Sequence, residues 1–433
     1  MGALQDGAIA GWRAWRMSAR ADVIVLGAGM VGVGVALHLQ KRGRDVVLID
    51  RRGAGEETSY GNAGLIQREA VIPYTFPREF GVILSYAMNN RRDAVYHLSA
   101  LPRVAPWLFR YWQNGAPERI ERSARALAPL MAQCVKEHEA LIEEAGGEAR
   151  SLVHQKGWIR CLRTEESLRN AVSEAKLLDT YGVDYAVLTG TQLRELEPHV
   201  SDEVIGAIHF RGSPTSSDPG KLTKAYAELF TRKGGRMLTG DARRLSAQPS
   251  GWNLPAQDGP IEAREVVVAL GPWSDDVFRP LGYDIPFAVK RGYHMHYGVK
   301  GNAILGHSLH DGDGGYALVP MEMGIRLTTG VEFASRDAPP SPVQLARVEP
   351  FARKLFPLGE RVEEQPWMGR RPCLPDMVPV IGRGLRHQGL WFAFGHAHHG
   401  FTLGPVTGRL LAEMMTGETP FTEPSFYAAD RFG

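Results

Sequence analysis

Short apolar runs alternate with helical repeats near the start of the chain. Asp22–Leu26 is an apolar, β-branched run, and a glycine-rich turn separates it from a helical pattern that ends at Arg42, before Gly43. A second apolar run follows at Asp45–Asp50. This order of strand, turn, helix and strand predicts a β–α–β unit within a parallel sheet.

The pattern changes in the next part of the chain. Helical periodicity covers Phe80–Gly146 and Glu165–Tyr181, with an alternating strand between them at Lys156–Leu162. Asp218-Pro219 predicts another helix start, because aspartate suits the N-cap and proline suits the first helical position. These segments interrupt the β–α–β pattern before it resumes.

Two kinds of strand follow. Arg264–Leu270 is strongly apolar, which is typical of a strand buried on both faces of a parallel sheet. Later alternating runs predict antiparallel strands at Phe287–Val299, Tyr316–Pro320, Gly324–Thr329 and Val331–Phe333. A last buried strand is expected at Leu390–Phe394, followed by a helix from Gly404 to Met415.

The interruptions predict an α/β fold (α+β overall) with a discontinuous nucleotide-binding domain. We expect this Rossmann-like domain to comprise residues 21–95, 216–286 and 370–433. A mixed, antiparallel-sheet substrate-binding domain would comprise residues 96–215 and 287–369. Residues 1–20 form an N-terminal extension whose favoured interpretation is a stretch upstream of a functional start at Met17; an amphipathic membrane-surface segment is the alternative.

Composition narrows the class of protein. The 433 residues suit two or three domains, and the net charge of +2, from 50 basic and 48 acidic residues, argues against nucleic acid as a partner. The three cysteines are widely spaced, which disfavours a disulfide framework or a zinc site. No apolar run is long enough to span a bilayer. We expect a cytoplasmic protein; peripheral attachment to the inner face of the cell membrane, a respiratory-chain contact, and a homo- or hetero-oligomer stay open.

The first turn carries a dinucleotide-binding motif. Gly27, Gly29 and Gly32 form G-x-G-x-x-G between a strand and a helix, where they permit a tight turn, close approach of the backbone to a pyrophosphate and close helix packing. Asp50 lies at the end of the second strand, the position from which an acid reads a ribose hydroxyl. The G-x-G-x-x-G motif alone is weak evidence for dinucleotide binding, but the strands and helix around it and the acid at Asp50 support that prediction.

The C-terminal part carries candidate chemistry for an acidic small molecule. Gly395–Gly408 is a glycine-rich turn that leads into a helix, and a helix N-terminus favours an anion. Arg371 lies upstream, and arginine suits a carboxylate because its fork donates two parallel hydrogen bonds. His396, His398 and His399 have no acid or cysteine in a recognisable ligand spacing, so we predict no metal site.

These motifs together resemble one family. From Ala21 onward the chain is similar to the D-amino-acid dehydrogenase group of the FAD-dependent amine and amino-acid oxidoreductases, which includes glycine oxidase, D-amino-acid oxidase and sarcosine oxidase. The segments that carry the resemblance are Gly27–Gly32 with Asp50, Thr58–Leu65, Ala269–Ser274, Gly369–Gly382 and Gly395–Gly408. A narrower resemblance, to bacterial D-hydroxyproline dehydrogenases (oxidases), rests on Tyr316–Met321, Gly324–Gly330 and Pro366–Pro372.

The resemblance implies FAD as cofactor and a set of residues that hold it. The implied cofactor-binding residues are Gly27, Gly29, Gly32, Asp50, Thr58, Ser59, Ala63, Gly64, Leu65, Ala242, Gly271, His399, Gly400, Phe401 and Thr402. Arg371 matches the arginine that binds the substrate carboxylate, and Tyr316 lies near the position of a tyrosine that covers it. Apart from the resemblance, Lys290 and Arg291 are candidates for positions near the flavin or simply for the end of their strand, and His294 is a candidate substrate contact. Cys373 is offset from the cysteine to which related sarcosine oxidases attach FAD, so we expect non-covalent FAD.

The resemblance also implies the reaction. We expect removal of the α-hydrogen of a D-amino acid as hydride onto flavin N5, giving an imino acid, with cis-4-hydroxy-D-proline or a D-proline-like compound as substrate. One alternative is an oxidase of glycine, sarcosine or another secondary amine. Another is the flavin subunit of a hetero-oligomeric amino-acid dehydrogenase, and a non-catalytic nucleotide-binding scaffold is disfavoured because it would not need Arg371.

Overall fold

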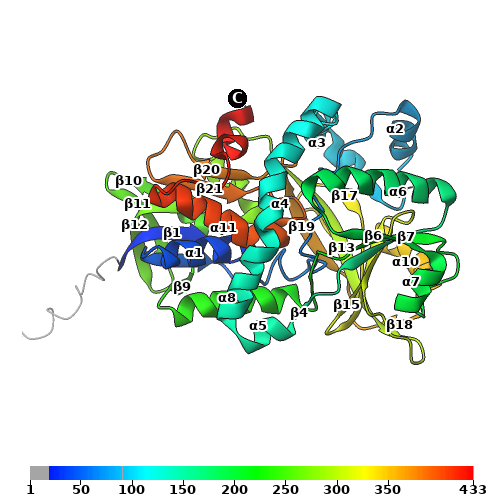
Figure 1. The fold of residues 1–433 in the computed structure, drawn as a ribbon. Helices are drawn as coiled ribbons and strands as arrows, with labels where there is room; N and C mark the ends of the chain where they lie inside the picture. Colours follow the sequence, from blue (N-terminus) through cyan, green and yellow to red (C-terminus); the bar gives the residue numbers. More distant parts are fainter. Residues whose placement is uncertain (1–18, 90, 433) are drawn as a thin grey trace, which may run out of the picture.

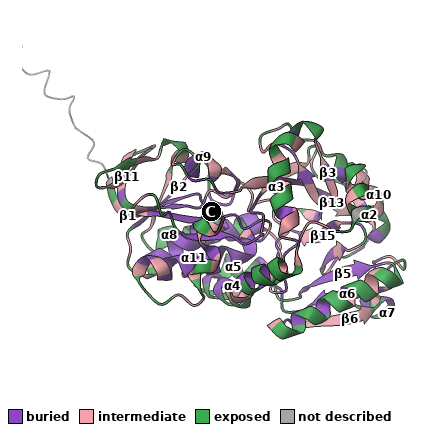
Figure 2. Cartoon of the chain, turned by 90° about the horizontal axis from the view of Figure 1, so that it is seen from above, coloured by how far each residue is buried: buried purple, intermediate pink, exposed green. Residues whose placement is uncertain are grey.

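The computed structural model describes residues 19–89 and 91–432, which form two regions, each built on one large sheet (Figure 1). The expectations for residues 1–18, including Met17 as a functional start, lie outside the described residues. Buried positions concentrate in the two sheets and in the helix faces that cover them (Figure 2).

The smaller sheet is the predicted nucleotide-binding sheet. Five of its strands are parallel: β1 (Ala19–Leu26), β2 (Val46–Asp50), β9 (Arg236–Thr239), β12 (Gly259–Val268) and β21 (Leu390–Phe394). Antiparallel strands extend it: β10 (Ser246–Gln248), β11 (Gly251–Ala256) and β20 (Val380–Arg383). Strand β12 lies between parallel neighbours, and Val266, Val267 and Val268 are fully buried. The prediction of a strand buried on both faces is confirmed.

The helix of the first β–α–β unit packs in a group of four helices. They are α1 (Met30–Lys41), α4 (Pro117–Ala145), α8 (Pro219–Arg232) and α11 (Gly400–Thr416). Asp218 caps α8 as predicted, since its carboxylate accepts a hydrogen bond of 2.9 Å from the Lys221 amide. The fold class and the β–α–β unit are therefore confirmed.

The larger sheet is mixed, and within the described residues it contains eleven strands. They are β3 (Ala94–Tyr96), β5 (Trp158–Leu162), β6 (Tyr185–Thr189), β7 (Gly206–Phe210), β13 (Ala288–Val299), β14 (Ser308–Asp311), β15 (Tyr316–Met321), β16 (Gly324–Thr328), β17 (Val331–Phe333), β18 (Leu358–Arg361) and β19 (Trp367–Cys373). The long strand β13 pairs with β16, β17, β18 and β19. Strands β4 (Val153–His154) and β8 (Thr215–Ser216) form a separate ribbon.

Further helices lie among the described residues. They are α2 (Phe80–Ala87), α3 (Leu101–Gln113), α5 (Gly147–Ser151), α6 (Glu165–Leu177), α7 (Gly190–Leu196), α9 (Asp275–Phe278) and α10 (Val343–Leu355), with 3₁₀ turns at Leu98–Ala100, Leu178–Tyr181, Ala242–Arg244, Gly271–Trp273, Pro424–Tyr427 and Ala429–Phe432. Across residues 19–89 and 91–432, every helix is too short or too polar to cross a bilayer.

The structure refines two predictions. Helix α11 begins at Gly400, so the expected start at Gly404 was four residues too late. The predicted domain divisions at 95/96 and 369/370 pass through β3 and β19, both of which belong to the larger sheet, where β3 pairs with β17 and β19 pairs with β13. Helix α4, assigned by sequence to the substrate part, packs on α8 and α11 beside the smaller sheet.

Helices α1 and α11 meet backbone to backbone. A Cβ atom at Gly34 would lie 2.6 Å from the Gly404 carbonyl oxygen, and one at Gly408 would lie 2.3 Å from the Gly34 carbonyl oxygen. A Cβ at Gly404 would lie 2.7 Å from the Met30 carbonyl oxygen. The two helices can approach this closely only because these positions have no side chain.

We expect Gly408→Ala to destabilise the fold, because a methyl group there must displace the α1 backbone. The free energy of unfolding, measured by urea denaturation, should fall by about 2 kcal/mol or more, the scale of overpacking in a core. Gly81→Ala is the matched control, since a Cβ at this exposed helical position would meet nothing within 4 Å. Equal stabilities of the two variants would contradict this account of the contact.

Candidate functional site

A cavity of about 610 Å³ is lined by both sheets, a size typical of small-molecule sites. Residues at the carboxyl ends of the parallel strands line this cavity. They are Gly27 after β1, Asp50 at the end of β2, Ala242 after β9 and Gly271 after β12. Ligands of open parallel sheets bind at this edge. The larger sheet contributes Lys290 and Arg371.

The turn between β1 and the first turn of α1 requires glycine at two positions. Gly27 has φ +102°, and a Cβ at Gly32 would lie 1.8 Å from the Gly27 carbonyl oxygen. Only glycine fits both positions, so the first turn of α1 lies directly against the end of β1. The helix N-terminus therefore lies beside the cavity, where it favours a phosphate group.

Asp50 lies beside this turn. Its carboxylate accepts hydrogen bonds from the backbone amides of Ala28 (2.7 Å) and Arg52 (3.0 Å). Burial raises the pKa of Asp50, and these two amides oppose that shift. Each carboxylate oxygen keeps a further acceptor site, so Asp50 can still read a hydroxyl group.

The segment 57–65 is tied to both sheets. The Ser59 hydroxyl accepts from the Met30 amide at 3.0 Å, which satisfies a free donor at the α1 N-terminus. The Thr58 hydroxyl donates to the Arg370 carbonyl at 3.1 Å. Thr402 closes the other end, since its hydroxyl donates to the Leu65 carbonyl at 3.0 Å. The loop is therefore held where it lines the cavity.

A buried histidine stabilises the early start of α11. Pro405 lies inside the helix and has no N–H to donate to the carbonyl of Phe401, four residues earlier. His138 on α4 supplies the missing donor, because its Nε2 lies 2.9 Å from that oxygen, while its Nδ1 lies 3.1 Å from the Tyr226 hydroxyl. The first turn of α11, with its free amides, is fixed at the cavity in this way.

The turn before α11 is joined to the larger sheet. The Ala397 amide donates to the Pro372 carbonyl at 2.8 Å, and His396 pairs with Cys373 in a β-bridge. Ala397 has φ +51°, an uncommon conformation for a residue with a side chain. Through this joint the α11 N-terminus and Arg371 border the same cavity.

Arg371 is a cation without an acidic partner among the described residues. Its Nη1 donates to the Gly330 carbonyl at 2.6 Å and its Nη2 to the Thr329 carbonyl at 3.2 Å. A Cβ at Gly292 would lie 2.6 Å from Nη2, so glycine there makes room for the guanidinium. Burial lowers the pKa of Arg371. The remaining donors suit an anionic ligand.

Lys290 adds a second positive charge. It is the cross-strand partner of Arg371, so both side chains lie on the same face of the sheet. Its ammonium nitrogen lies 3.9 Å from the ring centre of Tyr111 and 5.2 Å from that of Trp107. Lys290 and Arg371 make this part of the cavity cationic.

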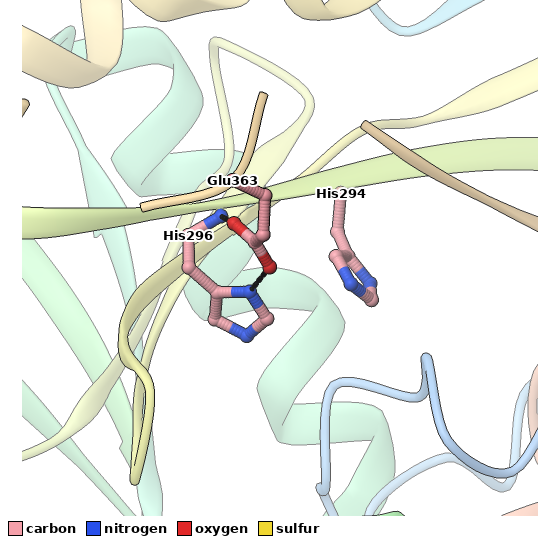
Figure 3. Close-up of side chains that lie close together, drawn as sticks. All are labelled: His294, His296 and Glu363. Carbon is pink, nitrogen blue, oxygen red and sulfur yellow. Dashed lines mark hydrogen bonds and ion pairs between the residues drawn. The ribbon is translucent and has the colours of Figure 1, made fainter. Parts of the chain in front are cut away.

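His294, His296 and Glu363 lie close enough together to suggest a metal ion (Figure 3). The Nδ1 atom of His296 instead hydrogen-bonds Glu363, and its Nε2 lies 2.9 Å from Nε of Arg326. A guanidinium at that distance repels a cation, so these contacts favour a hydrogen-bond network. Arg326 connects this network to segment 57–65, because its Nη1 donates to the Asn62 carbonyl at 2.5 Å.

The cavity brings most of the predicted site residues together. Those that line it are Gly27, Gly29, Asp50, Thr58, Ser59, Ala63, Leu65, Ala242, Gly271, Tyr316, Arg371, Gly400 and Phe401. Gly32, Gly64, His399 and Thr402 lie behind this lining, where they support it. His398 lines the cavity beside His399, and the two ring centres are 3.7 Å apart. Their roles toward a cofactor stay predictions.

Tyr316 reaches the cavity at the start of β15 but points its hydroxyl elsewhere. The hydroxyl lies 3.3 Å from Nη2 of Arg163, which also pairs with Asp311 at 2.7 Å. The Tyr316 ring belongs to the core between this sheet and α10. A contact of Tyr316 with a substrate carboxylate stays a prediction.

Sequence reasoning did not single out Arg160, His310 and His398 as cavity residues in their own right. Strand β14 was not predicted, and its pairing with β5 joins residues about 150 positions apart in the chain. No local periodicity signals such a register. His398 was considered only as one of three histidines in a glycine-rich turn.

A parallel sheet with a G-x-G-x-x-G turn that faces a cation-lined cavity is typical of enzymes that bind a dinucleotide. The chain belongs to the DAO family, FAD dependent oxidoreductase, whose family model matches residues 22–414. FAD is the cofactor of that family. The described residues fit it, because a Cβ at Gly29 would approach only Ser59 Oγ, at 3.4 Å, and one at Gly271 would meet nothing within 4 Å.

Individual relatives agree with the family. The chain is 28% identical over 425 residues to a D-amino-acid oxidase of Bradyrhizobium diazoefficiens, covering 95% of this chain and 98% of the relative. It is 29% identical to a D-amino acid dehydrogenase of Dechloromonas aromatica, covering 93% and 98%. The fold is similar to glycine oxidase from Geobacillus kaustophilus, with a TM-score of 0.70, 21% identity and coverage of 95% and 99%.

We expect His138 to make stability depend on pH. Burial lowers the pKa of His138 to about 4, below the ordinary value of 6.5. The unfolded chain therefore binds a proton that the folded chain rejects, and stability falls as pH drops below about 6.5. Between pH 7.5 and 5.0 this one side chain should account for a loss of about 2 kcal/mol.

Urea unfolding of FAD-saturated protein at the two pH values measures this loss. His138→Gln should reduce it by about 2 kcal/mol, while His154→Gln, at an exposed position, should leave it unchanged. An unchanged loss in His138→Gln would show that His138 does not carry the effect.

Proposed function

We propose that this protein is an FAD-dependent D-amino-acid dehydrogenase or oxidase that converts a D-amino acid to its imino acid. We further propose cis-4-hydroxy-D-proline or a D-proline-like amino acid as substrate. Two relatives named D-amino-acid oxidase and D-amino acid dehydrogenase support the reaction. The resemblance carried by Tyr316–Met321, Gly324–Gly330 and Pro366–Pro372 supports the substrate.

The observation that carries the proposal is the placement of Arg371. It presents a guanidinium that has no acidic partner among the described residues, beside the free amides at the start of α11. A cation kept partly buried without an internal counter-ion is costly unless a ligand neutralises it. An α-carboxylate has the charge and the planar geometry for this fork.

Each group then has a stated task. Arg371 fixes the substrate carboxylate and thereby orients Cα, which can lower the barrier by several kcal/mol, up to roughly 7–11 kcal/mol for ideal alignment. When bound, FAD supplies the acceptor for the hydride that leaves Cα, while the amine nitrogen loses a proton to give the imino acid. The α11 N-terminus favours the negative charge in the cavity. The positive charge of Lys290 also favours a negative charge in the cavity.

Arg371→Ala should leave FAD bound but lower kcat/KM by at least about 100-fold, the scale of a lost charge-assisted clamp. Arg371→Lys should recover only part of the activity, because lysine lacks the planar fork. Steady-state kinetics and the flavin absorbance of each purified variant measure both effects.

Arg370→Ala is the matched comparison. Arg370 is the neighbouring arginine on β19, and its Nε donates to the Arg336 carbonyl at 3.0 Å. A large loss in Arg370→Ala together with near-normal kinetics of Arg371→Ala would reverse the assignment of the carboxylate-binding arginine.

Anaerobic mixing with a panel of amino acids tests the reaction itself. Bleaching of the flavin absorbance is expected with D-amino acids, and most rapidly with cis-4-hydroxy-D-proline and D-proline. Rapid bleaching by glycine or sarcosine alone would favour an amine oxidase instead. Absence of bleaching by every D-amino acid would overturn the proposed function.

A further inference from the structure

A second polar group lines the cavity on strands β5 and β14. Arg160 and His310 are register partners in this parallel pair, so their side chains lie on the same face of the sheet. Ala317, the register partner of His310 on β15, lines the cavity from the same face. The cavity-facing surface therefore continues from β19 and β13 across to β5.

Both side chains carry a buried polar atom without a hydrogen-bond partner among the described residues. These atoms are Nε of Arg160 and Nδ1 of His310. Buried polar groups are nearly always satisfied, and leaving one unsatisfied costs about 1–3 kcal/mol. Two such atoms on neighbouring strands of one cavity wall indicate that a ligand completes them.

The surroundings hold both groups in place. Nη1 of Arg160 pairs with Glu174 at 2.6 Å, which anchors the outer end of the guanidinium. The His310 ring packs edge-on against Trp158, with ring centres 6.2 Å apart, and Trp158 is held by a 3.1 Å hydrogen bond to Glu69. The two orphan atoms are thus fixed before any ligand binds.

Glycine at position 312 leaves room for the Arg160 guanidinium, whose Nε is itself buried. A Cβ there would lie 3.1 Å from Nε, and Gly312 is not among the positions with positive φ. Its backbone therefore does not require glycine, but the space beside Nε does. Gly312 also lines the cavity.

The chemistry of the pair selects a hydroxyl group. Nε of Arg160 can only donate, whereas a neutral imidazole presents one donor and one acceptor nitrogen. Burial lowers the pKa of His310 to about 4, so the ring is neutral near pH 7. A hydroxyl can accept from Nε of Arg160 and can satisfy Nδ1 of His310 in either tautomer, because a hydroxyl both donates and accepts. A carboxylate would satisfy Nδ1 only when that nitrogen carries the proton, and a methylene satisfies neither atom.

We propose that Arg160 and His310 form a specificity subsite that binds a hydroxyl group on the amino-acid substrate, distinct from the carboxylate bound by Arg371. This inference rests on the proposed function and deepens it. A site built to hydrogen-bond a hydroxyl rejects the analogue that lacks it, because its polar atoms are then left unpaired. The enzyme should therefore prefer a hydroxylated D-amino acid over its deoxy analogue.

The test compares kcat/KM for cis-4-hydroxy-D-proline and D-proline. The wild type should prefer the hydroxylated compound by at least about 10-fold. His310→Leu should abolish most of this preference while kcat/KM for D-proline stays within about threefold of the wild-type value. Arg160→Lys, which keeps the charge and a partner for Glu174 but removes Nε, should act in the same direction.

Controls separate specificity from folding. Glu174→Gln removes the ion pair but leaves Nε of Arg160, so the preference should persist. Flavin absorbance and D-proline turnover report whether each variant is folded and loaded, and His310→Asn serves if His310→Leu does not fold. If cyclic D-amino acids do not react but others do, D-serine and D-alanine provide the hydroxylated and deoxy pair.

The outcomes distinguish the two proposals. Flavin bleaching by D-amino acids without a preference for the hydroxylated compound, or a preference that survives both substitutions, would overturn the subsite and leave the proposed function standing. No bleaching by any D-amino acid would overturn both. Loss of the preference in both variants, with D-proline turnover preserved, would support both.

Discussion

The contact between α1 and α11 is the constraint on which the site depends. The helices come from opposite ends of the chain, and they touch through the backbones of Gly34, Gly404 and Gly408. This close approach puts the start of α11 against Met30, the first residue of α1. Two helix N-termini therefore border one cavity, and each presents amides that no helical carbonyl can satisfy. A side chain at any of these glycines would push the two helices apart and move their N-termini away from each other.

The second sheet supplies what the first lacks. The smaller sheet offers amides and acids suited to a nucleotide, whereas the larger sheet brings Lys290 and Arg371 on adjacent strands. The hydrogen bond between Ala397 and Pro372 joins the two regions at the cavity. The cations lie on the rigid β13–β19 pair, so their positions are fixed by a ladder of backbone hydrogen bonds. A substrate held there takes its orientation from one sheet, and the family's cofactor binds at the edge of the other.

Much of the fold was readable from local pattern. The β–α–β unit, the buried strand at the end of β12 and the Asp218 cap of α8 all follow from patterns in short, continuous stretches of sequence. Arg371 was also identifiable as a candidate, because the segment Gly369–Pro372 resembles a family motif. Local pattern failed where distant groups intervene. Gly404-Pro405 looks like a helix start, since proline favours the first turn, yet α11 begins at Gly400 because His138 satisfies the carbonyl that Pro405 leaves free.

The sequence by itself determined the nucleotide-binding half, since its glycines, caps and apolar runs act over short distances. Only the tertiary structure decided which side chains face the cavity from the larger sheet. Tyr316 turns its hydroxyl toward Arg163, while Arg160 and His310, in strands about 150 residues apart, become neighbours on the cavity wall. The reason is physical: a strand's alternation says that successive side chains point to opposite faces, but the face each side chain meets is set by the register with strands far away in the chain.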